Sequence, residues 1–98
     1  MLLKAGVDIS RLRPEIRKKL NVIEEIMETR GYPLVITSTY EGTHSASSLH
    51  YANLAVDIRL PDIRTYDYVE ALRKKLGHDY DVVAESDHIH IEYDPKSI

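Results

Sequence analysis

Two short segments of this sequence alternate between aliphatic and polar side chains, and this alternation restricts the fold more than any other feature. Residues 55–59 read Ala-Val-Asp-Ile-Arg, and residues 88–92 read His-Ile-His-Ile-Glu. Successive side chains of a β-strand point to opposite faces. Both segments are therefore predicted to be strands, each with an aliphatic face for helices to cover and a polar face carrying Asp57 or His90.

Helical spacing elsewhere in the sequence supplies the expected cover for the aliphatic face. Apolar residues recur at helical intervals between Pro14 and Arg30, where we expect one long amphipathic helix. A second helix is predicted to open at Pro61 and Asp62 and to end at Gly77. Its inward stripe is expected to hold four apolar residues: Tyr66, Val69, Leu72 and Leu76.

The remaining segments complete a single small domain. The runs at 34–37 and 80–84 are rich in β-branched residues and predict two more strands, and the Ser-, Thr- and Gly-rich stretch 38–48 predicts a surface loop. We therefore expect residues 1–98 to form one α+β domain. In it, a small antiparallel sheet has helices packed on one face and a metal site on the other.

Composition and charge exclude several classes of function. A formal net charge of −3 gives no broad attraction to phosphate backbones, so neither nucleic acid binding nor nuclease activity is expected. Without cysteine, a metal must be held by His, Asp or Glu. Residues 1–10 resemble neither a signal peptide nor a membrane span, so we expect cytoplasmic synthesis and no membrane partner.

Three residues on the polar side could share one metal ion: His50, Asp57 and His90. A zinc site for hydrolysis needs about three protein ligands and one open position for water. A His-x-His pair on a strand is more often hydrogen-bonded or exposed than metal-bound. Asp57 is less easily explained without a metal, because aspartate is depleted in strands and a buried carboxylate needs a partner. His78 follows the second helix and is expected to be a surface residue.

The run from Ser48 to Asp57 resembles the S-x-H-x-x-G-x-A-x-D motif of the D-Ala-D-Ala metallopeptidases and of the amino-terminal signalling domain of hedgehog proteins. It reads Ser-Leu-His-Tyr-Ala-Asn-Leu-Ala-Val-Asp, so four of the five fixed positions match. Asn53 replaces the glycine, and asparagine is the side chain that best tolerates the left-handed backbone expected there. The resemblance extends from about Val35 to Tyr93. It includes His44-Ser45 upstream of this run, and Glu85-Ser86 followed by His88-Ile89-His90 downstream of it.

The resemblance implies a zinc site with three protein ligands: His50, Asp57 and His90. A carboxylate near the last ligand would be the general base, taking a proton from water and delivering it to the leaving amine. Glu85 resembles the hedgehog and carboxypeptidase glutamate and is favoured, while Asp87 has the spacing seen in some phage endolysins. His44 and His88 would stabilise the developing negative charge without binding zinc.

The implied activity is zinc-dependent hydrolysis of peptidoglycan stem peptides, by a carboxypeptidase or an endopeptidase, and the implied site of action is the cell wall after phage-type release. Glu41 stands where these peptidases often have an arginine that grips a substrate carboxylate. This weakens the expectation of a carboxypeptidase unless Arg59 or Arg64 faces the cleft. The alternative is an inactive, zinc-stabilised binding module of the hedgehog type. No calcium site is expected, and the sequence does not specify an oligomeric state.

Overall fold

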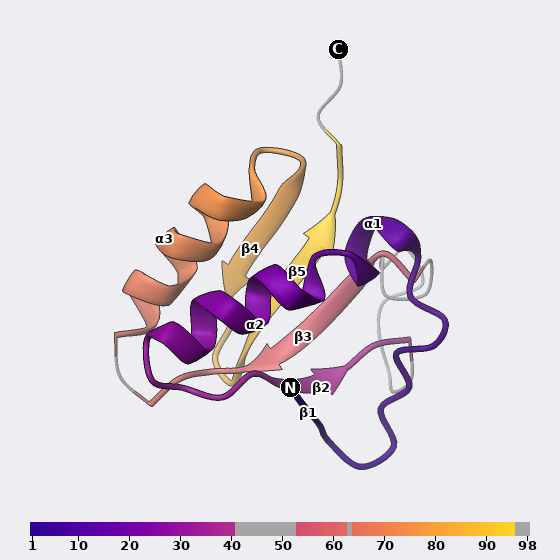
Figure 1. The fold of residues 1–98 in the computed structure, drawn as a ribbon, viewed down its shortest axis with the longest axis horizontal. Helices are drawn as coiled ribbons and strands as arrows, with labels where there is room; N and C mark the ends of the chain where they lie inside the picture. Colours follow the sequence, from indigo (N-terminus) through magenta and orange to yellow (C-terminus); the bar gives the residue numbers. More distant parts are fainter. Residues whose placement is uncertain (41–52, 63, 96–98) are drawn as a thin grey trace.

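A five-stranded sheet lies at the centre of the structure, a computed structural model that describes residues 1–40, 53–62 and 64–95 (Figure 1). Its strand order is β1-β2-β3-β5-β4, and every neighbouring pair is antiparallel except β1 with β2. The strands are β1 (Leu2–Leu3), β2 (Val35–Ser38), β3 (Ala55–Arg59), β4 (Tyr80–Ala84) and β5 (His88–Tyr93). The described helices are α1 (Pro14–Arg17), α2 (Leu20–Thr29) and α3 (Thr65–Leu76). The predicted α+β fold class is confirmed.

The helices cover one face of the sheet, as Figure 1 shows for α2 and α3. The aliphatic faces of β3 and β5 pack beneath them, and four of their side chains are fully buried: Val56, Ile58, Ile89 and Ile91. Burying each such side chain contributes about 1.5–3 kcal/mol. The alternating pattern therefore orients the polar residues of both strands toward the opposite face, here called the outer face.

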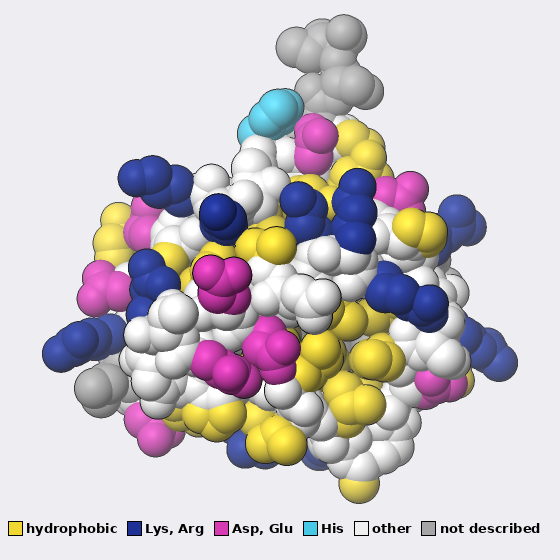
Figure 2. All heavy atoms as spheres, viewed as in Figure 1, with side chains coloured by type: hydrophobic (Ala, Val, Ile, Leu, Met, Phe, Trp, Pro, Cys, Tyr) yellow, Lys and Arg dark blue, Asp and Glu magenta, His cyan; other side chains and the backbone are white. Residues whose placement is uncertain are grey.

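The helix-covered side of the molecule carries mixed charges. In Figure 2, Lys and Arg side chains are interspersed with Asp and Glu side chains on this side. This view shows no continuous basic stripe of the kind that holds nucleic acid phosphates. In the described parts of the chain, none of the helices combines the length and hydropathy of a membrane span.

The single helix predicted for residues 14–30 is wrong, because the chain divides it into α1 and α2. The Lys19 N–H donates to the carbonyl of Ile16 at 2.9 Å, three residues back, rather than to that of Glu15, four residues back. The Glu15 carbonyl instead accepts a hydrogen bond of 2.7 Å from the hydroxyl of Tyr80 on β4. A long-range contact thus competes for the carbonyl that a continuous helix would use.

The inward stripe of α3 also differs from the prediction at one position. Tyr66 is 72% exposed, whereas Tyr68 is buried together with Val69, Leu72 and Leu76. The helix begins only at Thr65, so Tyr66 lies in its first turn, and the hydroxyl of Tyr68 donates to the carbonyl of Arg30 just past α2. Tyr68 therefore joins α3 to the end of α2.

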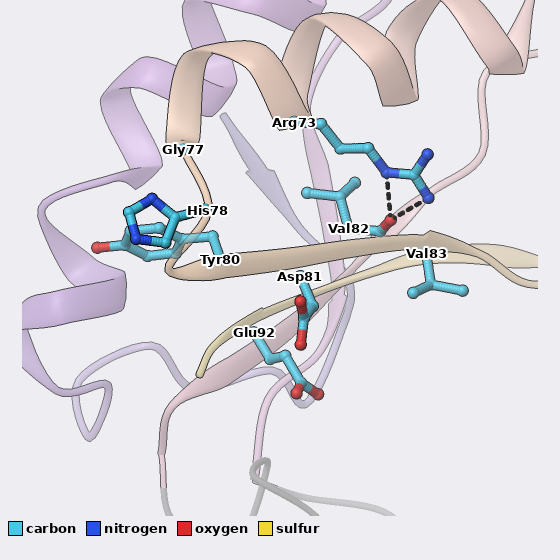
Figure 3. A pocket seen from close by; sticks show the side chains of 8 residues that line it. All are labelled: Arg73, Gly77, His78, Tyr80, Asp81, Val82, Val83 and Glu92. Carbon is cyan, nitrogen blue, oxygen red and sulfur yellow. Dashed lines mark hydrogen bonds between the residues drawn. The ribbon is translucent and has the colours of Figure 1, made fainter. Parts of the chain in front are cut away.

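Arg73 on α3 donates two hydrogen bonds to a backbone carbonyl of the edge strand β4. Its Nε and one terminal nitrogen donate to the Val82 carbonyl at 3.0 and 2.8 Å (Figure 3). Replacing Arg73 with alanine is expected to lower the free energy of unfolding by about 1 kcal/mol, because these charge-assisted hydrogen bonds are lost at a half-exposed position. Urea unfolding measures the change.

Glu70→Ala is the matched control for Arg73→Ala. It removes the exposed ion pair of 3.2 Å between Glu70 and Arg73 and leaves the contact with Val82 in place. Exposed pairs of this kind contribute roughly 0.2–1 kcal/mol, so we expect a smaller loss. Equal losses in the two variants would contradict a stabilising role for the Val82 contact.

Candidate active site

Asp57 and His90 lie directly opposite each other in the pairing of β3 with β5. Their side chains meet on the outer face, where Asp57 Oδ1 is 2.9 Å from His90 Nδ1. Asp57 is only 7% exposed, and a buried carboxylate needs polar partners, of which His90 is one. The structure thus brings together two of the three predicted metal ligands.

The contacts continue from this pair in both directions along the outer face. His88 Nε2 lies 3.6 Å from the same Asp57 oxygen, and His88 Nδ1 lies 2.6 Å from Asp87 Oδ1. On the other side, His90 Nε2 lies 2.6 Å from Glu92 Oε1. We call these five residues the outer-face cluster: Asp57, Asp87, His88, His90 and Glu92.

The structure places the other predicted site residues as follows. Glu85 lies across the β4–β5 turn, where its backbone N–H donates to the His88 carbonyl at 2.8 Å and its side chain is exposed. His44 and His50 lie outside the described residues. His78, predicted to be a surface residue, has an 84% exposed side chain 3.3 Å from Asp79.

Asn53 has the left-handed backbone predicted for the position where the resembled motif has glycine. Its φ is 61°, and its carbonyl accepts a hydrogen bond of 3.0 Å from the Arg13 N–H. Two residues later the chain enters β3. Asn53 therefore adopts the left-handed backbone conformation just before the strand that carries Asp57.

Glu92 belongs to the cluster but was not among the predicted site residues. The signal for it was present, because the His-Ile-His-Ile-Glu alternation places it on the same face as both histidines. Glu92 also lies beside Asp81 and Asp94, and their carboxylate oxygens lie within 4.8 Å of one another. Such a concentration of negative charge attracts cations to this side of the sheet.

The two carboxylates beside His90 raise the pKa of its ring above the ordinary value of 6.5. The hydrogen bond to Asp57 is the largest cause, partial burial opposes it, and the hydrogen bond to Glu92 adds to it. A neutral imidazole has one N–H, so only the protonated ring can donate to both carboxylates. In the metal-free protein these two contacts therefore favour the protonated form of His90.

The raised pKa predicts how the stability of the metal-free protein depends on pH. The stabilisation is fully present below the unfolded-state value near 6.5 and is lost as pH rises through the folded-state pKa. Urea unfolding in the presence of chelator should therefore show stability falling as the pH rises above about 6.5. The matched control His90→Gln should show a flatter profile, and identical profiles would contradict the assignment to His90.

The donor atoms on the outer face suit a zinc ion. Nitrogen and oxygen ligands of a tetrahedral zinc lie about 2.0–2.2 Å from the ion, which places them roughly 3.3 Å from each other. The Asp57–His90 separation of 2.9 Å and the Asp57–His88 separation of 3.6 Å are both close to this value. The positions of Asp57 and His90 therefore fit a shared ion. The separation of His88 from Asp57 is also compatible with a ligand, so this distance does not exclude His88 from the ligand set.

The fold and this cluster define a small α+β domain whose outer face combines carboxylates and imidazoles suited to metal-assisted hydrolysis. A family model described as Peptidase M15 matches residues 2–92, so the chain belongs to the M15 peptidase family. Peptidases of this family are generally metal-dependent. No curated protein and no solved structure matches the chain.

Proposed function

We propose that this M15-type peptidase uses zinc to hydrolyse peptidoglycan stem peptides. The observation that carries the proposal is the contact of 2.9 Å between Asp57 and His90, formed by two paired strands on the face opposite the helices. His50, seven residues before Asp57 in the sequence, is the third proposed ligand because of the family resemblance. Zinc, when bound, supplies a Lewis acid that favours deprotonation of water and polarises the scissile carbonyl.

The general base is a carboxylate on the turn between β4 and β5. The described contacts favour Asp87, because its Oδ1 lies 2.6 Å from His88 and His88 in turn faces Asp57. Glu85, favoured by the resemblance, is the alternative on the same turn. The base takes a proton from the attacking water and delivers it to the leaving amine. His88 and His44 donate hydrogen bonds to the oxygen that gains negative charge.

Arg59 is the candidate for holding a substrate carboxylate in place of the missing arginine at position 41. It lies two residues after Asp57 on β3, so alternation directs its side chain to the same face, and it pairs with His88 across β3 and β5. Arg59 is exposed and therefore accessible to a substrate. We propose that it binds the free carboxylate of a stem peptide.

Metal analysis and peptide digestion together test the proposed function. Purified protein should contain about one zinc per chain, and His50→Ala should lose it while His88→Ala retains it. Mass spectrometry of stem peptides incubated with the zinc-loaded protein should show new shorter products. Zinc retained in His50→Ala would contradict the ligand set, and intact peptides with wild-type protein would contradict the activity.

A second candidate function is an inactive, zinc-stabilised module that binds stem peptides. Glu41 favours it, because the position lacks the arginine that these peptidases often use. Calorimetry on the zinc-loaded protein would detect stem-peptide binding. Binding without any shortened product would favour this module over the peptidase.

A further inference from the structure

Glu92 contacts the ring nitrogen of His90 that faces away from Asp57. His90 Nε2 lies 2.6 Å from Glu92 Oε1, while His90 Nδ1 lies 2.9 Å from Asp57 Oδ1. Both contacts are sheltered, since the side chains of His90 and Glu92 are 19% and 21% exposed. The imidazole is thus held at both nitrogens by carboxylates from two different strands.

A histidine that binds a metal through one nitrogen carries its hydrogen on the other. The group that accepts this hydrogen selects the tautomer, orients the ring and raises its basicity as a ligand. We propose that Glu92 is a positioning residue that accepts the Nε2 hydrogen of His90 and keeps Nδ1 directed at the ion shared with Asp57. This inference rests on the proposed function, because it assigns Glu92 a role toward the same metal.

The position of Glu92 suits support of the ring better than direct binding of the shared ion. Its carboxylate contacts Nε2, on the edge of the His90 ring opposite Asp57. Glu92 would therefore influence an ion bound at Nδ1 indirectly, by orienting the ring and raising its basicity. Asp81 stands opposite Glu92 in the β4–β5 pairing, and Figure 3 shows both carboxylates on the same side of the sheet. The carboxylate of Asp81 repels that of Glu92. A hydrogen bond from the N–H of His90 offsets this repulsion and is therefore favourable for Glu92.

Zinc affinity, measured by competition with a chromogenic chelator, tests the positioning role. Glu92→Ala is expected to weaken zinc binding by about 10–100-fold, the usual effect of removing a hydrogen-bond partner of a metal ligand. Glu92→Gln should restore part of this loss, because its amide oxygen still accepts the hydrogen bond. Asp81→Asn is the matched control, since it removes a neighbouring charge while the Glu92–His90 contact remains. It should change affinity by less than about threefold.

Nitrogen-15 NMR of the His90 ring gives a second readout that does not require zinc. In metal-free protein at pH 6, the Nε2 hydrogen should give a downfield signal in the wild type and in Asp81→Asn. The signal should be lost in Glu92→Ala, with melting curves confirming that each variant is folded.

The outcomes separate this inference from the proposed function. Wild-type protein that binds zinc with the same affinity as Glu92→Ala overturns the positioning role and leaves the peptidase proposal intact. A loss of zinc affinity equal in Asp81→Asn and Glu92→Ala also overturns it, because general charge would then explain the effect. Wild-type protein that binds no zinc overturns the proposed function, and the positioning role with it.

Discussion

Replacing Asp57 with alanine is expected to remove the bound metal and to lower turnover of stem peptides by at least about 10³-fold. A metal ion supplies several kcal/mol of transition-state stabilisation, and each 1.4 kcal/mol corresponds to about a factor of ten. Asp57 is a proposed ligand and lies close to both neighbouring imidazoles, at 2.9 Å from His90 and 3.6 Å from His88. Metal content per chain and initial rates on one stem peptide measure the two effects.

Asp81→Asn is again the control for Asp57→Ala, because both variants remove one carboxylate from the outer face. Asp81→Asn should keep about one metal per chain and most of the turnover. Circular dichroism of Asp57→Ala separates loss of metal from loss of fold, which matters because the buried carboxylate also stabilises the protonated His90 ring. A folded Asp57→Ala protein with full metal content would refute the proposed ligand set.

Asp87→Ala is expected to lower turnover by about 10²–10⁴-fold while zinc content stays unchanged. General acid–base groups contribute rate factors of this size, and a base that is not a ligand leaves the metal in place. Asp87 is favoured because it contacts His88 at 2.6 Å and so belongs to the outer-face cluster. Steady-state kinetics with parallel metal analysis measure both quantities.

Glu85→Ala distinguishes the two carboxylates of the turn. If Asp87 is the base, Glu85→Ala should lower turnover by less than about tenfold, because Glu85 would then take no part in proton transfer. The reverse order, with the larger loss in Glu85→Ala, would assign the base to the glutamate favoured by the family resemblance. Equal and small losses in both would exclude the turn as its source.

The sequence predicted β3 and β4 accurately because the residue pattern of each strand agrees with its environment. The predicted bounds 55–59 and 80–84 coincide with β3 and β4, where aliphatic residues alternate with residues that face outward. β1 was not predicted. Its Leu2 and Leu3 are 57% and 44% exposed and pair with β2 through backbone hydrogen bonds, which leave no pattern of burial in the sequence.

The errors arose where a distant residue decides the local structure. The interruption between α1 and α2 depends on the Tyr80 hydroxyl at the Glu15 carbonyl, a contact between residues 65 positions apart. The choice of Tyr68 rather than Tyr66 depends on the Arg30 carbonyl at the end of α2. Helical periodicity contains no information on such partners.

The candidate site was predictable in part, because strand alternation fixes which face a side chain occupies but not which atoms it contacts. Alternation placed Asp57 and His90 on one face, and the structure brings them into contact. The alternation also placed Glu92 there, but residue type and spacing do not reveal which nitrogen of His90 it contacts. The ligand role of His50 stays a prediction that rests on the family resemblance, because His50 lies outside the described residues.

The left-handed conformation of Asn53 gives a physical reason why an asparagine can stand where the motif has glycine. Asn53 has a φ of 61°, a left-handed conformation that glycine adopts readily, and β3 begins two residues later. A search that demands glycine there would pass over chains of this type. Defining the position by its permitted backbone angles, with glycine and asparagine as equivalents, would recover more divergent members of the family.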